Sequence, residues 1–160
     1  MNEMSLLAFA AHLSAIGADM AHGDHDAMDR AARIVEDEAK ASAGSYQGQS
    51  GPFAAWAELA DSTKADRAHQ GFPENEPELR TGEMRDSIER TVLPSGREAE
   101  VGSDSQVLEW QELGTATMPP RSILGGAAAR VETEVAEVLA GGFLSELVGG
   151  EVYQGRLRIS

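Results

Sequence analysis

Apolar residues recur every seven positions through the first part of the chain, from about residue 3 to residue 43. The recurring residues are Leu6, Leu13, Met20, Ala27 and Ile34, with Phe9 and Ile16 between them. This spacing places them along one narrow face of an α-helix, and abundant alanine also favours helix. We expect a long helix that kinks or breaks at Gly23-Asp24 and stops at Gly44. Its apolar face would pack against the last helix, a neighbouring subunit, or both.

A second helical pattern lies near the end of the chain, from about Arg121 to Ala140. Its apolar positions are Leu124, Ala128, Val131, Val135 and Val138, at helical spacing. Pro120 would stand in the first turn, and Gly141-Gly142 would end the helix. Residues 143–148 are compatible with one more helical turn. Residues 151–159 then alternate, with Tyr153, Leu157 and Ile159 on one side, which predicts a terminal strand.

The residues between these two helices carry shorter patterns. The first part predicts a loop at Gly44 to Pro52, a short helix at Ala54 to Leu59, a helix capped by Ser62 or Thr63 and running through Ala68, and an exposed loop at Gly71 to Pro77. A helix is then expected at Leu79 to Ile88, with Thr81 as N-cap and with Met84 and Ile88 inward. A strand–turn–strand unit follows at Thr91 to Leu93, Pro94 to Gly96 and Arg97 to Gly102, and a helix at Gln106 to Leu113 ends at Gly114.

These elements predict one α+β domain over residues 1–160. A long N-terminal helix and a C-terminal helix would pack on a small, mainly antiparallel β-sheet. Along the chain we distinguish a helical segment at 1–43, a loop-rich part with short helices at 44–80, the sheet and last long helix at 81–140, and an extension with a possible strand at 141–160.

The chain is strongly acidic, with 13 Lys and Arg against 27 Asp and Glu and a net charge of -14. Binding along nucleic-acid phosphates or on an anionic membrane needs clustered cations, so both are disfavoured. No apolar run approaches the roughly 20 residues of a membrane helix, and the first residues lack the basic region of a signal peptide. We therefore expect assembly in the cytoplasm. Cysteine is absent, which excludes disulfides and thiolate chemistry.

One cluster of histidines and aspartates has metal-ligating side chains. It comprises His12, His22, His25, Asp19, Asp24, Asp26 and Asp29. A metal site needs convergent ligands with oriented imidazoles, whereas a polar stripe opposite an apolar one is typical of a solvated helix face. We favour the solvated face. Serine-nucleophile and phosphate-loop motifs are absent, and Gly125-Gly126 indicates close helix packing. We expect no catalytic residue, metal or cofactor, and a metal-dependent hydrolase is the weakest alternative.

Several short motifs follow one another between Trp56 and Ala129. They are Trp56-Ala57-Glu58-Leu59 with Thr63, Leu79 to Ile88, Val101-Gly102-Ser103, Glu112-Leu113-Gly114-Thr115, and Met118-Pro119-Pro120-Arg121 through Leu124 and Ala127. In order and spacing they resemble the tail-completion or neck proteins of long-tailed phages, also called minor tail or virion morphogenesis proteins. The chain departs from that pattern at Ser122-Ile123, where Pro-Phe is common, and at Leu108-Glu109-Trp110, where Tyr-Ala is usual. The first 50 residues and those after Gly142 lie outside the resemblance.

The resemblance implies a non-enzymatic virion protein at the head–tail junction of a phage or a phage-like gene transfer agent. It would form a homo-oligomeric ring, six-fold by preference, that joins the head connector to the tail tube. DNA would pass through the lumen without specific binding, other connector and tail-tube proteins would be partners, and no membrane would be involved. Two alternatives stay open: a tail-terminator or head-closure subunit of the same assembly, and a small acidic adaptor or inhibitor unrelated to virions.

The motifs single out a set of interface or structural residues. These are Trp56, Leu79, Gly82, Met84, Ile88, Trp110, Glu112, Gly114, Thr115, Pro120, Arg121 and Leu124. We expect Trp56 in the core, and Trp110 either in the core or at an interface. Gly82 and Gly114 would permit positive φ, and Thr115 would bond backbone in its turn.

Arg121 is expected at a helix start, where a cation is unfavourable against the helix dipole. It should therefore reach a carboxylate, either Glu112 or one on a neighbouring subunit. On that interpretation Arg121→Ala would impair ring assembly more than folding of the monomer.

Overall fold

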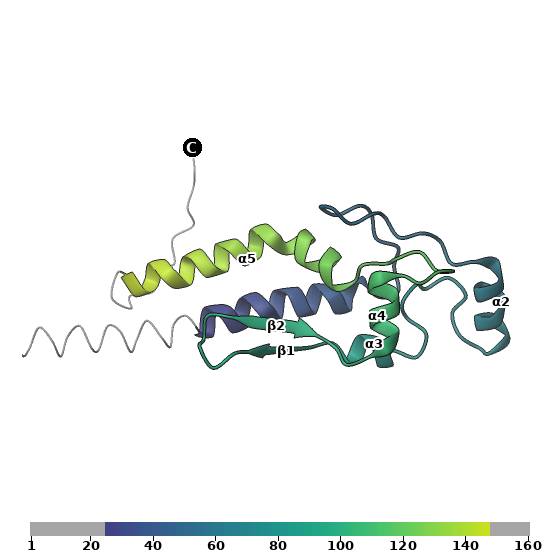
Figure 1. The fold of residues 1–160 in the computed structure, drawn as a ribbon, viewed down its shortest axis with the longest axis horizontal. Helices are drawn as coiled ribbons and strands as arrows, with labels where there is room; N and C mark the ends of the chain where they lie inside the picture. The colour runs from purple at the N-terminus through teal and green to yellow at the C-terminus, as the bar shows by residue number, and fades with distance from the viewer. Residues whose placement is uncertain (1–24, 148–160) are drawn as a thin grey trace, which may run out of the picture.

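The computed structural model describes residues 25–147, with a long helix at each end of that range (Figure 1). In chain order the elements are a helix at residues 25–42, α2 (Asp61–His69), α3 (Glu83–Asp86), β1 (Glu89–Val92), β2 (Ala99–Gly102), α4 (Gln106–Leu113) and α5 (Leu124–Leu147). The predicted α+β class is confirmed, because long helices precede and follow a small antiparallel sheet. None of the described helices is long and apolar enough to cross a membrane.

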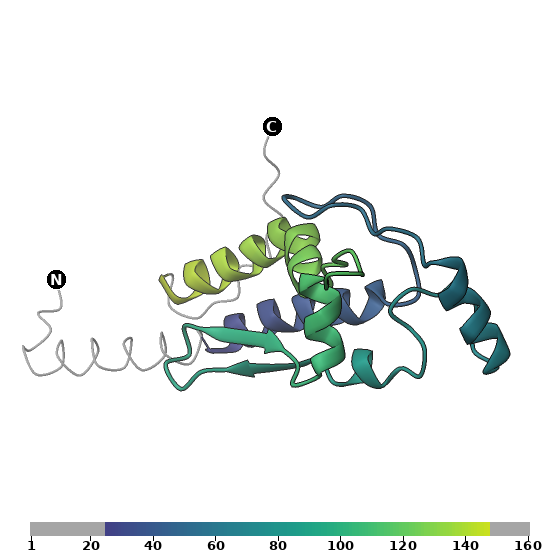
Figure 2. The ribbon, with the colours of Figure 1, turned by 45° about the vertical axis from the view of Figure 1, so that its right-hand side comes forward.

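Helix 25–42 packs against both α5 and the β1–β2 hairpin (Figures 1 and 2). Arg130 of α5 donates a hydrogen bond to Glu38 of this helix. Farther along α5, a Cβ atom added to Gly142 would lie only 2.5 Å from the Cβ atom of Ala27. The two helices therefore approach closely at this point, and glycine in α5 serves that approach.

The hairpin is fixed to helix 25–42 by one arginine. The register pairs Arg90 with Val101, and both side chains are half-buried. Arg90 Nε donates to Asp29 Oδ1 at 3.0 Å, and Arg90 Nη1 donates to Glu36 Oε2. The bond from Arg90 lowers the pKa of Asp29 below its usual value. An ion-paired arginine, and not apolar contact alone, therefore holds the sheet on the helix.

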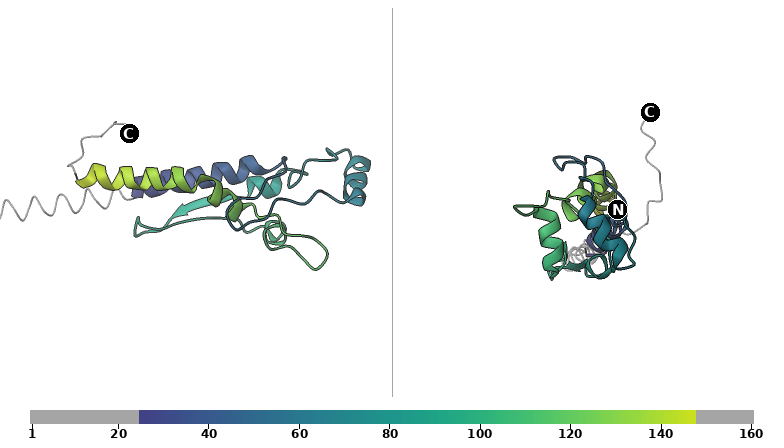
Figure 3. Two further views of the ribbon diagram at one scale, coloured as in Figure 1. Left: turned by 90° about the horizontal axis from the view of Figure 1, so that it is seen from above. Right: turned by 90° about the vertical axis from the view of Figure 1, so that its right-hand side faces the viewer.

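The main apolar core lies where helix 25–42, the loop at residues 44–60, α4 and the start of α5 meet. Its buried members are Ala39, Trp56, Ile88, Leu108, Ile123 and Ala127. Trp56 and Ile88 were both expected to point inward, and the structure confirms this. In Figure 3 the element α2 lies at the opposite end of the molecule from the turn of the hairpin.

The helix expected at Ala54 to Leu59 does not form, because tertiary partners occupy its backbone groups. Trp56 N donates to Gln47 O at 2.9 Å, and Leu59 N donates to the Tyr46 hydroxyl at 3.0 Å. The Ala57 carbonyl accepts from a side chain described below. An extended segment leaves these groups free to bond outward, whereas a helix would bond them internally.

Other expected boundaries also move. The expected helix at Leu79 to Ile88 shrinks to α3, because Gly82 adopts φ +91° and acts as its N-cap in place of Thr81. Ser62 and Thr63 lie inside the first turn of α2, whose N-cap is Ala60, without a side-chain cap. Pro77, at the end of a loop expected to be exposed, is fully buried.

The last helix was wrongly bounded at both ends. α5 begins at Leu124, beyond Pro120 and Arg121, and it continues through Gly141-Gly142 to Leu147. By contrast, α4 has its predicted bounds and the strand–turn–strand unit is confirmed. The apolar positions before residue 25, the kink at Gly23-Asp24 and the strand at 151–159 lie outside the described residues.

Candidate functional site

The start of α5 is capped by a side chain from α4, the carboxylate of Glu112. Its Oε2 accepts from Ile123 N at 2.6 Å and from Leu124 N at 2.9 Å. Its Oε1 accepts from Gly125 N at 3.0 Å and from the Ser122 hydroxyl at 2.5 Å. A helix start leaves N–H donors unsatisfied and carries partial positive charge, so a carboxylate stabilises it twice over. Glu112 thus serves α5 and is not the partner of Arg121.

Arg121 is buried immediately before this capped start, with a side chain only 4% exposed. Its Nε and Nη2 atoms donate to the Ala57 carbonyl at 3.1 and 3.0 Å, and Nη2 also donates to the Glu58 carbonyl at 3.2 Å. The nearest carboxylate is that of Glu78, whose Oε1 lies 3.7 Å from Arg121 Nε. Within the chain, Arg121 therefore has a carboxylate partner, as expected, but this partner is Glu78 and not Glu112.

Glu78 is an unusual residue that the sequence did not reveal. It is a non-glycine residue at φ +61°, and its side chain is 1% exposed. Both carboxyl oxygens lack a hydrogen-bond partner among the described residues. Burial raises the pKa of Glu78 to about 7, against the opposing charges of Arg121 and Arg67. A buried charge with incomplete hydrogen bonding costs free energy.

A second buried arginine holds the backbone on which Glu78 stands. Arg67 of α2 donates from Nη1 to the Glu76 carbonyl at 2.6 Å and to the Leu79 carbonyl at 3.2 Å. These bonds hold the chain on both sides of Glu78, which explains how a non-glycine residue is kept at positive φ. α2 is thereby tied to the interior by its one buried side chain.

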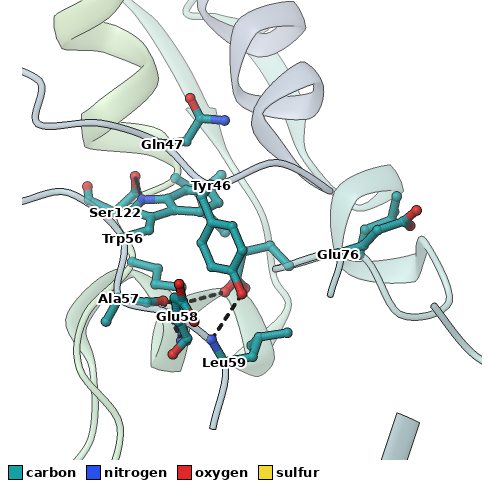
Figure 4. Close-up of polar contacts among 12 residues, drawn as sticks. Tyr46, Gln47, Trp56, Ala57, Glu58, Leu59, Glu76 and Ser122 are labelled. Atoms are coloured by element: carbon teal, nitrogen blue, oxygen red, sulfur yellow. Dashed lines mark hydrogen bonds and ion pairs between the residues drawn. The ribbon is translucent and has the colours of Figure 1, made fainter. Parts of the chain in front are cut away.

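Two aromatic side chains join the loop at residues 44–60 to the same region (Figure 4). Trp56 Nε1 donates to the Ser122 carbonyl at 3.2 Å. The Tyr46 hydroxyl donates to Asn75 Oδ1 at 2.6 Å, and it accepts from Leu59 N. We call the set Trp56, Glu78, Glu112, Arg121 and Ser122 the α5-start cluster. It brings together residues from four separate parts of the chain.

Gly114 closes the loop between α4 and α5. It adopts φ +74° and ψ 176°, and an added Cβ atom would lie 2.8 Å from Pro120 N and 2.9 Å from Met118 O. Thr115 forms an isolated bridge with Met118, and its Oγ1 accepts from Thr117 N at 3.4 Å, which is the expected turn contact. The glycine is needed here for both conformation and space.

The outward side of α4 is apolar and exposed. Val107, Trp110 and Leu113 are 46%, 47% and 71% exposed, and their three-residue spacing puts them along one side of the helix. We call these three residues the α4 face. Trp110 is therefore not a core residue of the described chain. Large exposed apolar side chains grouped together are typical of interaction sites.

The remaining residues singled out by sequence serve packing. Leu79 contacts Gly44, where an added Cβ atom would lie 3.2 Å from Leu79 Cδ2. Met84 and Leu124 pack against the core from its edge, and Pro120 is exposed. The sequence reasoning missed Glu78, Arg67, Tyr46 and Ser122. Only Ser122 carried a signal, since serine beside a helix start is a common capping residue.

A cavity of about 610 Å³ lies between α2, α3 and α4, and Glu78, Arg67 and Gln111 are among its lining residues. The Glu78 oxygens are nevertheless covered, so this carboxyl is not accessible from the cavity in this conformation. Of the histidine–aspartate cluster, His25, Asp26 and Asp29 are described. His25 Nδ1 and Asp26 Oδ1 lie 4.0 Å apart on an exposed surface, and Asp29 forms ion pairs with Arg33 and Arg90. No group of three or more potential metal ligands occurs among the residues that the structure describes.

Comparison of the chain with protein-family models, with curated proteins and with solved structures finds no match.

Proposed function

We propose that this chain is a structural virion protein of the head–tail junction, in a phage or a phage-like gene transfer agent. Copies of it form a ring, six-fold by preference, that joins the head connector to the tail tube around the DNA channel. The proposal starts from the resemblance of the motifs between Trp56 and Ala129 to neck and tail-completion proteins.

The positions of the motif residues support an architectural role. Trp56, Glu112 and Arg121 come from different motifs, yet each bonds to backbone groups in one region. Trp56 donates to the Ser122 carbonyl and Glu112 accepts from Ile123 N, both at the start of α5, and Arg121 donates to the Ala57 carbonyl. Motifs that converge on backbone groups fix the relative positions of elements. A rigid framework of this kind is what a ring subunit needs, because its interfaces must be presented in a fixed orientation.

The observation that carries the proposal is the α4 face. Val107, Trp110 and Leu113 expose much of their surface on one short helix. In an isolated subunit this apolar surface stays in water, so the free energy gained by burying it is available to a partner. Tryptophan is enriched among the residues that dominate binding energy at interfaces. α4 lies inside the motif-bearing stretch, and Leu113 belongs to one of its motifs, whereas Trp110 stands where the chain departs from the family pattern.

The test measures assembly of the full chain with Trp110→Ser. Wild-type protein is expected to form a discrete ring, detected by native mass spectrometry and electron microscopy. Loss of a central tryptophan typically costs about 2 kcal/mol of association free energy, which weakens assembly roughly 30-fold. Leu144→Ser is the matched control, since Leu144 is exposed to almost the same degree, 48%, on α5.

Particle production gives the functional arm of the test. With Trp110→Ser in the particle-producing cell, filled heads and finished tails should accumulate unjoined, and Leu144→Ser should leave particle yield unchanged. Accumulation of tails of abnormal length would favour the tail-terminator alternative, and loss of DNA from heads would favour head closure. A wild-type chain that stays monomeric and binds no head or tail component would overturn the proposal in favour of an acidic adaptor.

A further inference from the structure

The β1–β2 hairpin has a free edge on β2. The sheet has only two strands in the described part of the chain, and β1 pairs with one side of β2. Strand edges with unpaired N–H and C=O groups attract further strands, so proteins usually cover them. A two-stranded sheet is also marginal without further packing. The edge of β2 can therefore accept a further strand.

An apolar groove runs alongside β2, between that strand, helix 25–42 and α5. Its volume is about 320 Å³, and none of its lining residues is charged. Met28, Val35, Val101, Ala128 and Leu139 are among them. A segment placed beside β2 would direct every second side chain into this groove and the others to the opposite face of the sheet.

The opposite face of the hairpin is acidic. A shallow hollow of about 590 Å³ on that side is bordered by Glu89, Glu100 and Asp104 together with hydroxyl side chains. Among the described residues, none of these three carboxylates forms an ion pair with a cation. A strand added at this edge would therefore fit best with apolar side chains on the groove side and basic side chains on the acidic side.

Residues 153–159 have this alternation. Tyr153, Leu157 and Ile159 occupy odd positions, and Arg156 and Arg158 occupy even positions, whereas Glu151 and Val152 fall outside the pattern. We propose that residues 151–159 dock in the same chain as a third strand along the free edge of β2, with Tyr153, Leu157 and Ile159 in the groove and the arginines beside Glu100. The groove, the carboxylates and the alternation are independent of the proposed function.

The path of the chain permits this placement. α5 ends at Leu147, at the same end of the molecule as the turn that leads into β2 (Figure 1). In the proposed placement, Gly149 and Gly150 would supply the reversal that brings the segment back. The returning segment would run parallel to β2. α5 lies behind the sheet in Figure 1, as Figure 3 shows from above. The crossover from β2 through α5 to the added strand would therefore have the usual right-handed sense.

Disulfide trapping tests the proposal, and the absence of cysteine makes the chain well suited to it. E100C is combined with R156C, R158C or L157C in the full chain at low concentration. With the proposed pairing, R156C or R158C lies on the same face as E100C and oxidises within one chain. L157C points to the other face, so its cross-linking should be slower by about tenfold, since its effective concentration at that face is low.

D61C on exposed α2, combined with R156C, gives the background rate at the far end of the molecule. Intact mass and peptide mapping distinguish links within a chain from links between chains. Equal rates at positions 156, 157 and 158 would show that the segment does not lie on the edge as a strand. Links formed only between chains would overturn docking within the same chain. Glu100 and Asp61 are exposed, so the substitutions at these two positions should leave folding intact.

Discussion

Glu78 Oε1 lies 3.7 Å from Arg121 Nε in the interior, and both side chains are almost fully buried. The guanidinium directs its hydrogen bonds to the Ala57 and Glu58 carbonyls instead of the carboxylate. The pair is therefore held by charge without hydrogen bonding, and Glu78 keeps a desolvation cost that Arg121 offsets only in part.

Stability should fall as pH rises through the pKa of Glu78. This pKa is about 7 in the folded chain and 4.5 in its ordinary state. The folded state therefore binds more protons between these values, and the free energy of unfolding decreases as pH rises from about 4.5 to beyond 7. The shift corresponds to at most roughly 3 kcal/mol. Urea unfolding of Glu78→Gln, compared with wild type from pH 5 to pH 8, should show this pH dependence much reduced.

At pH 5 the glutamine variant and wild type should be similar, because Glu78 is then neutral. At pH 8 the variant should be the more stable of the two. Glu58→Gln is the control, since the Glu58 side chain is 81% exposed and should follow the wild-type curve. Identical slopes for Glu78→Gln and wild type would show that Glu78 does not titrate in this range.

Arg121→Met should destabilise the monomer itself, which reverses the expectation drawn from sequence. The substitution leaves Glu78 without its nearest cation and two backbone carbonyls without donors. Removal of one partner of a buried pair costs about 3 to 5 kcal/mol. The double variant Glu78→Gln with Arg121→Met should be more stable than the sum of the two single effects predicts, by about 1 to 3 kcal/mol, because Glu78→Gln removes the charge that Arg121→Met leaves unpaired. Additive effects in urea unfolding at pH 8 would argue against coupling.

Local signals predicted the parts of the fold that depend on neighbours in sequence. α4 has its predicted bounds because Gly114 stops it with a positive φ. The hairpin was predicted because Pro94 to Gly96 form a turn between alternating residues, and Gly96 N bonds to Leu93 O across it. Neither prediction required knowledge of distant contacts.

The α5-start cluster could be predicted only in part. A cation before a helix start needs a carboxylate, which predicts a partner for Arg121 but does not identify it as Glu78. Glu112 was the nearer candidate, yet four donors from residues 122–125 surround its carboxylate. Residues 54–59 favour a helix by local propensity, but the structure has an extended segment there because its backbone groups bond to Tyr46 and Arg121. Such competition is decided by tertiary structure.

Glu112→Ala should weaken the start of α5. The substitution removes the acceptor of three backbone N–H groups, and loss of a helix cap costs about 1 to 2 kcal/mol. Glu109→Ala is the matched control, because Glu109 is exposed on the same helix. Thermal unfolding followed by circular dichroism should show a lower midpoint for Glu112→Ala alone. Equal midpoints for the two variants would mean that the cap contributes little.

Two glycines with positive φ should respond differently to asparagine. Gly82 has φ +91° and ψ -15°, within reach of the left-handed region that asparagine tolerates. Its added Cβ would meet two side-chain ends, Arg85 Nη2 at 3.3 Å and Asp86 Oδ2 at 3.6 Å. Gly114 has φ +74° and ψ 176°, a region used almost only by glycine. Its added Cβ would also meet backbone atoms of Met118 and Pro120. Gly114→Asn should therefore cost on the order of 3 kcal/mol, from backbone strain and the displaced loop together. Gly82→Asn should cost about 1 kcal/mol or less.

Urea unfolding of both asparagine variants, with Gly48→Ala as a control, measures this difference. Gly48 has no atom within 4 Å of an added Cβ, so that variant should match wild type. If Gly114→Asn proved as stable as Gly82→Asn, the loop from Gly114 to Pro120 would have to relax easily. Just beyond that loop, the backbone N–H of Arg121 donates to Gln111 O at 2.7 Å. The position of Arg121 would then not depend on Gly114.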